Sequence, residues 1–222
     1  MPKAVIFDVD GTLIDTVALH ARAWEDTFRR FGHEVPAERI RGQIGKGGDQ
    51  LMPVFVERSK VEEHGQEMER FRADWFKERY LPEARGFPGV RELFERIRAQ
   101  GSSIALASSC KADELDGYME LAGIPDLVDA RTTSDDAERS KPEPDIFEAA
   151  LERLGGTAPE DAVVVGDSPY DAEAAGKAGI KAVGLLSGGF SEAELREAGC
   201  IAIYRDPEDL LRQFATSPLA NR

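Results

Sequence analysis

The sequence predicts an α/β fold in which a doubly wound parallel sheet carries an inserted helical cap subdomain. First, short and continuous apolar runs alternate with amphipathic segments through most of the chain. Second, the segment 15–85 lacks any strand-like run and is helix-periodic. Third, a length of 222 residues suits one large domain or a core with a modest insertion.

Five apolar runs predict the strands of the sheet. They are continuous and not alternating, which is typical of parallel strands that helices cover on both faces. In chain order they are Ala4–Phe7, Ser103–Ala107, Ala162–Val165, Ile180–Leu185 and Cys200–Ile203.

Amphipathic segments between these runs predict the helices. Gly89–Gln100 places its apolar residues on one stripe and is followed by Gly101, a typical helix stop. Pro144–Leu154 has a proline at its first turn, the position where a missing N–H costs least. A third helix is expected from about Pro169 to Ala178. These alternating units resemble a Rossmann-like sheet.

The segment 15–85 predicts a helical subdomain inserted into a core formed by residues 1–14 and 86–222. Its charged stretches ALHARAWEDTFRRFG and EEHGQEMERFRADWFKERYL have helical periodicity. We expect its hinges near Leu13–Thr16 and Leu81–Pro88, where prolines and a glycine cluster. The final residues, TSPLANR, are expected to be frayed.

Composition limits the partners. With 28 Lys and Arg against 42 Asp and Glu, the net charge is −14, which repels nucleic-acid phosphates and anionic membrane surfaces. Neither nucleic acid nor membrane is expected as a partner. Two cysteines suggest a reducing compartment, and neither a secretory leader nor a span of ~18–20 apolar residues is recognisable. We therefore expect a cytoplasmic protein. The sequence shows no exposed apolar stripe that would point to an oligomer, so the oligomeric state stays open.

Two acids directly follow the first predicted strand, in Asp8-Val9-Asp10-Gly11-Thr12. Ligands of open α/β sheets bind at the carboxyl ends of strands, so both carboxylates can face one pocket there. The alternative is a common Asp-Gly turn that merely ends a strand.

Three later signals stand at similar positions. Ser108 and Ser109 follow the second strand, Lys141 lies between two strands, and Asp167 and Asp171 follow the third. Each has a structural alternative: the serines or Asp167 could cap a helix, Asp171 could complement a helix dipole, and Lys141 could be a surface residue.

Taken together, these residues have one chemical logic. Carboxylates that converge on a rim can bind Mg²⁺, and a metal, a lysine and a hydroxyl suit a phosphoryl group. One carboxylate can attack phosphorus to form an aspartyl phosphate. A second can protonate the leaving oxygen and then activate water.

The chain resembles the haloacid dehalogenase superfamily of phosphotransferases. The resemblance rests on DVDGT at Asp8–Thr12, LASS at Leu106–Ser109, SKPEPDIF at Ser140–Phe147 and GDSPYDAEAAGKAG at Gly166–Gly179, which occur in family order. The position of the insert, after the first motif, is similar to that of the family's small helical cap.

This resemblance implies roles for the acids. Asp8 would be the nucleophile and a Mg²⁺ ligand. Asp10 would be the general acid and base, with its backbone carbonyl on the metal. Asp167 would be the third metal ligand, and Asp171 would orient a metal-bound water or the lysine. The superfamily's dehalogenases lack the second aspartate of the first motif, so Asp10 favours phosphoryl transfer.

It also implies roles for the other core residues. Ser108 would hydrogen-bond the transferring phosphoryl group, and Ser109 is counted with the substrate-binding residues. Lys141 would neutralise charge between Asp8 and the phosphoryl oxygens.

Two cap residues are candidates for substrate binding. TVALHARAW at Thr16–Trp24 resembles the matching segment of beta-phosphoglucomutases and of sugar-phosphate and phosphoglycolate phosphatases. It contains His20, whose alternative is a packing or surface role. Lys46 lies in the glycine-rich stretch IGKGGD, which either reaches over the substrate or forms a solvated turn. Beta-phosphoglucomutases typically carry an arginine in this loop, and this chain has none there.

The sequence therefore predicts a Mg²⁺-dependent phosphatase of a small phosphorylated metabolite, a sugar phosphate or phosphoglycolate-like monoester, acting through phospho-Asp8. The first alternative is a phosphosugar mutase of the beta-phosphoglucomutase type, with the same core. The second is a catalytically silent binding module, against which the complete set of acids argues.

Overall fold

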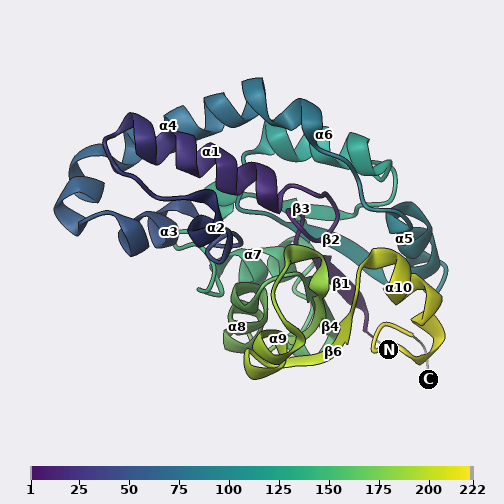
Figure 1. The fold of residues 1–222 in the computed structure, drawn as a ribbon. Helices are drawn as coiled ribbons and strands as arrows, with labels where there is room; N and C mark the ends of the chain where they lie inside the picture. The colour runs from purple at the N-terminus through teal and green to yellow at the C-terminus, as the bar shows by residue number, and fades with distance from the viewer. Residues whose placement is uncertain (1, 221–222) are drawn as a thin grey trace.

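The computed structural model describes residues 2–220 and has a six-stranded parallel sheet at its centre (Figure 1). The strand order is β3-β2-β1-β4-β5-β6, with β1 near the middle. The strands are β1 Ala4–Phe7, β2 Ser103–Ala107, β3 Ala130–Thr132, β4 Ala162–Gly166, β5 Lys181–Leu185 and β6 Cys200–Tyr204.

The register of the three central strands brings their carboxyl ends to one level. Phe7 of β1 pairs with Leu106 of β2 and with Val165 of β4. The residues that follow these strands therefore leave the sheet side by side, at the edge where ligands of such sheets bind.

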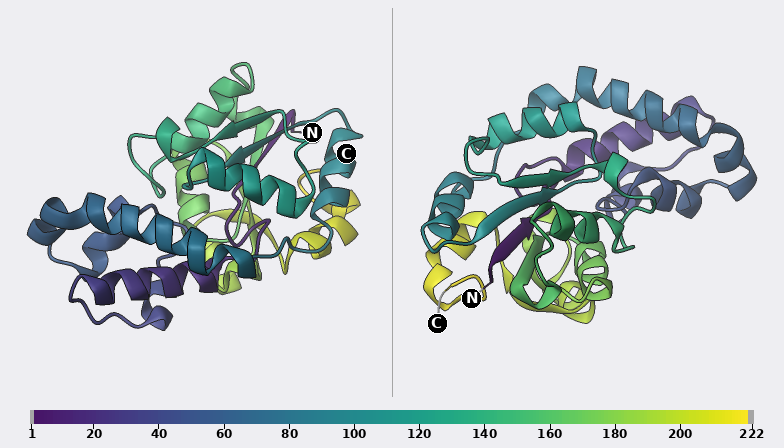
Figure 2. Two further views of the ribbon diagram at one scale, coloured as in Figure 1. Left: turned by 90° about the horizontal axis from the view of Figure 1, so that it is seen from above. Right: turned by 180° about the vertical axis from the view of Figure 1, so that it is seen from behind.

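Six helices in the described core cover both faces of the sheet, which explains its apolar strands (Figures 1 and 2). One apolar cluster joins one sheet face to α5, α6 and α10, and a second joins the other face to α7, α8 and α9. These helices are α5 Val90–Arg98, α6 Ala112–Ala122, α7 Asp145–Arg153, α8 Pro169–Lys177, α9 Glu192–Glu197 and α10 Pro207–Arg212.

Four helices between β1 and α5 form a separate lobe, which extends to the left in Figure 1. They are α1 Val17–Arg30, α2 Ala37–Arg41, α3 Gly48–Phe55 and α4 Arg58–Arg79. This lobe, the cap, has its own apolar cluster, contributed mainly by α1, α3 and α4. Five single turns of 3-10 helix complete the described chain: Leu81–Glu83, Ser134–Asp136, Pro159–Asp161, Leu186–Gly188 and Phe214–Thr216.

The two connections between cap and core run next to each other. The Asp15 N–H donates to the Arg85 carbonyl at 2.8 Å, and the Phe87 N–H donates to the Leu13 carbonyl at 2.9 Å. The end of α4 also packs into the core, because Phe76 and Tyr80 belong to the apolar cluster of α5 and α6. The cap is therefore joined to the core by two hydrogen-bonded connecting segments and by an apolar contact at the end of α4.

Two expectations from the sequence were wrong. Strand β3 was missed because its residues, Ala130–Thr132, include an arginine and form no apolar run; pairing with β2 makes them a strand. The chain end was expected to be frayed, but Leu219 and Ala220 are buried in the core cluster. The last two residues of TSPLANR lie outside the described residues.

Among residues 2–220, no helix combines the length and the apolar character that crossing a membrane would need.

Candidate active site

Asp8 and Lys141 form a buried ion pair at the carboxyl end of β1. The Lys141 Nζ lies 2.5 Å from Asp8 Oδ1 and 2.8 Å from Asp171 Oδ1, and it donates to the Ala107 carbonyl at 3.1 Å. Lys141 is only 1% exposed, so the alternative of a surface lysine is wrong. Burial opposes its charge, but Asp171 and Asp8 outweigh burial and keep its pKa above the usual value.

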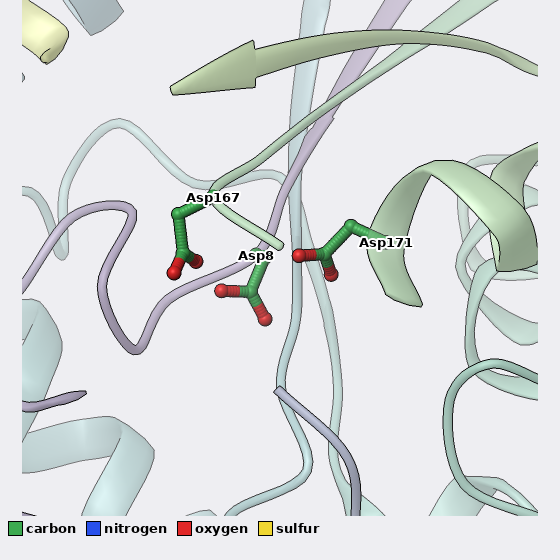
Figure 3. Close-up of side chains that lie close together, drawn as sticks. All are labelled: Asp8, Asp167 and Asp171. Atoms are coloured by element: carbon green, nitrogen blue, oxygen red, sulfur yellow. The ribbon is translucent and has the colours of Figure 1, made fainter. Parts of the chain in front are cut away.

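Three buried carboxylates converge at this edge of the sheet (Figure 3). Asp8 follows β1, Asp167 follows β4, and Asp171 lies in the first turn of α8. Each offers an oxygen within 4.8 Å of the other two. The Thr12 hydroxyl stands between two of them, 3.1 Å from Asp8 Oδ2 and 2.8 Å from Asp167 Oδ1.

Crowding of these acids has an electrostatic cost. Burial, together with the charges of Asp171 and Asp10, raises the pKa of Asp8 to about 7 although Lys141 lowers it. Burial and the charges of Asp8 and Asp171 raise the pKa of Asp167 well above its usual value. One lysine thus leaves the three-carboxylate cluster short of positive charge, which a bound cation would supply.

The donor set fits Mg²⁺. All the available ligands are oxygens, which Mg²⁺ prefers. Two glycines allow the Asp167 carboxylate to lie directly against the backbone: a Cβ at Gly11 would lie 2.3 Å from Asp167 Oδ2, and a Cβ at Gly188 would lie 2.0 Å from it. Gly11 also has a φ of +84°, a backbone conformation that is unfavourable for residues other than glycine.

Asp171 differs from the other two acids because it holds the start of its own helix as well as Lys141. Its Oδ1 faces Lys141, and its Oδ2 accepts from the Ser168 N–H at 3.1 Å and from the Ser168 hydroxyl at 2.6 Å. Ser168 and Asp171 form a capping box that begins α8, so Ser168, and not Asp167, is the N-cap. Asp171 therefore fixes Lys141 and the start of α8.

Asp10 points toward the cap. Its Oδ1 accepts from the Thr16 hydroxyl at 2.7 Å and lies 2.9 Å from His20 Nε2. Burial disfavours the Asp10 carboxylate, but the charge and hydrogen bond of His20, with bonds from Thr16 and Tyr118, keep its pKa below the usual value. The surface alternative for His20 is wrong, because the ring is buried and stacks on Phe76 at 4.0 Å.

The two serines end β2 beside these acids. Ser108 is fully buried, and its Oγ accepts from the Cys110 N–H at 3.2 Å, which leaves its hydroxyl proton available. Ser109 lines the neighbouring cavity. Neither caps a helix with its side chain, since α6 begins after Lys111 with no side-chain cap.

A cavity of about 560 Å³ lies between the cap and the core and opens onto Asp8 and Asp10. Its cap side is a polar face of α4, at helical spacing, formed by Gln66, Glu69, Arg70, Ala73, Asp74 and Lys77. His20, Lys46 and Ser109 also line it, whereas Ser108, Lys141 and Asp167 do not.

Several lining residues were missed by sequence reasoning. Arg70 and Arg72 of the cap line the cavity, and neither was singled out from the sequence. Arg72 is half-buried, its guanidinium lies 5.7 Å from the Trp24 ring, and its Nε has no hydrogen-bond partner among the described residues. The signal available in the sequence was the helical spacing of the polar residues 66, 69, 70 and 77 opposite the apolar residues of α4.

Fold and site together define an α/β enzyme with buried carboxylates at the carboxyl edge of a parallel sheet. Comparison with known proteins gives the family: residues 5–185 match the model of the haloacid dehalogenase-like hydrolases. The chain belongs to this family and is an enzyme of the hydrolase class.

Two relatives of similar length are named as phosphatases. The chain is 30% identical to the phosphorylated carbohydrates phosphatase of Thermotoga maritima, over 94% of this chain and 96% of that one. It is 31% identical to the phosphoglycolate phosphatase of Nitrosospira multiformis, over 90% of each. Among solved structures, a hydrolase from Pseudomonas syringae superposes with a TM-score of 0.87 at 29% identity, over 97% of this chain and 99% of that one.

Proposed function

We propose that this hydrolase is a Mg²⁺-dependent phosphatase of a small phosphate monoester, a sugar phosphate or a phosphoglycolate-like compound. The observation that carries the proposal is the Asp8 carboxylate, which contacts Lys141 at 2.5 Å, lies beside Asp167 and lines the cavity between the cap and the core. Such a carboxylate can act as a nucleophile toward phosphorus.

The first step transfers the phosphoryl group to Asp8. A carboxylate oxygen of Asp8 forms a bond to phosphorus, the bond from phosphorus to the leaving oxygen breaks, and Asp10 gives that oxygen a proton. Lys141 stays beside Asp8 Oδ1 and balances charge as the acyl phosphate forms. The Ser108 hydroxyl lies at the end of the adjacent strand and is free to donate to a phosphoryl oxygen.

The second step releases phosphate. Asp10 takes a proton from water, the water oxygen attacks phosphorus, and the bond to Asp8 breaks. Contacts from His20 and Thr16 favour the ionised form of Asp10, which is the form that this step needs. Asp8, Asp167 and the Asp10 carbonyl would hold Mg²⁺, which when bound withdraws charge from the phosphoryl oxygens.

The cavity supports a small, polar leaving group. Its volume of about 560 Å³ is typical of small-molecule sites, and acids and bases alternate on its cap side. Hydroxyl groups can both donate to Glu69 and Asp74 and accept from Arg70 and Arg72 there. The relatives named for phosphorylated carbohydrates and phosphoglycolate have substrates of this size and polarity.

Turnover of a panel of phosphate monoesters tests the proposed function. Sugar phosphates and phosphoglycolate are supplied with Mg²⁺ or with EDTA, and free phosphate is measured. We expect Mg²⁺-dependent release from at least one sugar phosphate or phosphoglycolate. Beta-glucose 1-phosphate with a trace of its 1,6-bisphosphate is included. Glucose 6-phosphate formed without matching phosphate release would instead establish the mutase, and folded protein inactive on the whole panel would support the silent module.

Mg²⁺ should also stabilise the folded protein, because a cation offsets the repulsion between Asp8 and Asp167. At a metal concentration a hundredfold above Kd, the gain is about 2.7 kcal/mol, or roughly 5–10 °C in Tm for a chain of this size. Thermal unfolding with Mg²⁺ and with EDTA measures it.

Two variants sharpen this measurement. Asp167→Asn should lose the increase in Tm. Asp209→Asn should keep it, because Asp209 pairs with Arg205 at 3.0 Å outside the candidate site. An equal increase in Asp167→Asn and in the unaltered protein would remove Asp167 from the metal site.

A further inference from the structure

We propose that Tyr170 is a positioning residue that holds the cap loop, residues 42–49, closed over the active site. Tyr170 belongs to the core, in the first turn of α8, between Asp167 and Asp171. The loop belongs to the cap and runs from the end of α2 into the first turn of α3. The consequence for turnover rests on the proposed function, whereas the contact itself is tested independently of it.

Tyr170 contacts the cap loop in two different ways. Its hydroxyl donates to the Gly42 carbonyl at 2.6 Å, across 128 positions of sequence. The face of its ring lies 4.6 Å from the Lys46 Nζ, within the range of a cation–π contact. The ring also meets the edge of Phe190, with centroids 6.0 Å apart, so its position is fixed from the core side.

The glycines of the loop allow it to lie directly on the core. A Cβ at Gly45 would lie 2.6 Å from the Ser168 Oγ, and a Cβ at Gly47 would lie 2.0 Å from the Ser140 Oγ. Gly45 also has a φ of +107°. Ser140 precedes Lys141, and Ser168 follows Asp167. The loop therefore rests on both of the core segments that carry the charged residues of the site.

Lys46 has one partner within the loop and one on the core. Burial lowers the pKa of Lys46, with an opposing effect from the charge of Glu173. Its Nζ donates to Gln43 Oε1 at 2.6 Å within the loop, and the Tyr170 ring is its partner on the core. A cation–π contact strengthens as the cation is desolvated, so the pair favours the closed cap.

A weaker closed state should change apparent affinity more than chemistry. Substrate enters the open form, and closure over bound substrate excludes water from the reaction. If closure remains favourable with substrate bound, losing part of the contact between Tyr170 and the cap loop raises KM and leaves kcat nearly unchanged. Replacing a residue that only stabilises α8 would not raise KM while leaving kcat nearly unchanged.

Amide hydrogen exchange of residues 42–49, without substrate, tests the contact. We expect about tenfold faster exchange in Tyr170→Ala, which loses the hydrogen bond and the ring. Tyr170→Phe keeps the ring and should show a smaller increase, about threefold. Tyr204→Phe is the matched control, because it removes a hydroxyl that no described contact joins to the cap, and it should exchange like the unaltered protein.

Exchange at β1 and at 172–177 of α8 reports on folding and should stay unchanged in all three variants. Unchanged exchange at 42–49 in Tyr170→Ala would overturn the proposal, as would an increase in α8 equal to that in the loop. With a substrate from the panel, KM should rise about threefold to tenfold in Tyr170→Ala, with kcat within about twofold. A fall in kcat at constant KM would also contradict it. An absence of turnover in the unaltered protein would count against the proposed function alone. Hydrogen exchange of residues 42–49 would still test whether Tyr170 holds the cap loop.

Discussion

Replacing Asp8 with asparagine should lower steady turnover by about three orders of magnitude or more while the protein stays folded. An amide cannot form the acyl phosphate, so the covalent route closes. Folding should persist because asparagine has the same size: its amide oxygen can still accept from Lys141, and its NH2 group then faces the Thr12 hydroxyl, which can accept. The pKa of Asp8 near 7 indicates that its charge is held at a cost, so the neutral side chain should not lower the unfolding free energy.

Turnover of the best panel substrate and urea unfolding of the same preparation check this prediction together. Asp209→Asn is a control for the loss of one buried-acid charge elsewhere and should retain full turnover. Acid-quenched protein incubated with radiolabelled substrate should carry label in the unaltered enzyme and none in Asp8→Asn. Steady turnover by Asp8→Asn would exclude Asp8 as the nucleophile.

Replacing Lys141 with methionine should damage both activity and stability. Methionine fills a similar volume, so the loss reports mainly on charge. Without the ammonium group, Asp8, Asp167 and Asp171 are buried with no neighbouring cation, and breaking such a pair costs about 3–5 kcal/mol. Turnover should fall at least about a hundredfold, because no ammonium group then balances charge beside Asp8 Oδ1.

Urea unfolding in EDTA measures the loss of stability without a contribution from metal. Lys177→Met is the matched control, since Lys177 pairs with Glu143 at 2.8 Å on the surface, where such pairs contribute about 1 kcal/mol or less. In an Asp171→Asn background the cost of Lys141→Met should shrink, because one of the unbalanced charges is already gone. Equal losses of unfolding free energy for Lys141→Met and Lys177→Met would contradict the inference that Lys141 balances the charge of the buried acids.

The sequence itself determined the central sheet and the positions of its reactive ends. The runs at Ala4–Phe7 and Ser103–Ala107 became β1 and β2 with the expected bounds, and Ala162–Val165 became β4 with one further residue. Buried parallel strands need continuous apolar residues, so the local sequence is enough to predict these strands. The acids Asp8 and Asp167 could be placed because they directly follow such strands.

Tertiary structure decided the features that depend on distant contacts. Strand β3 exists only because β2 pairs with it, and the burial of Lys141 depends on an acid 133 positions away. No local period encodes the approach of Tyr170 to Gly42, or of His20 to Asp10 and Tyr118. Hydrophobic periodicity reports which face of an element is buried, but not which polar groups another element brings to it. For that reason the sequence placed the acids of the site, whereas the folded chain alone showed which charges balance them and what closes over them.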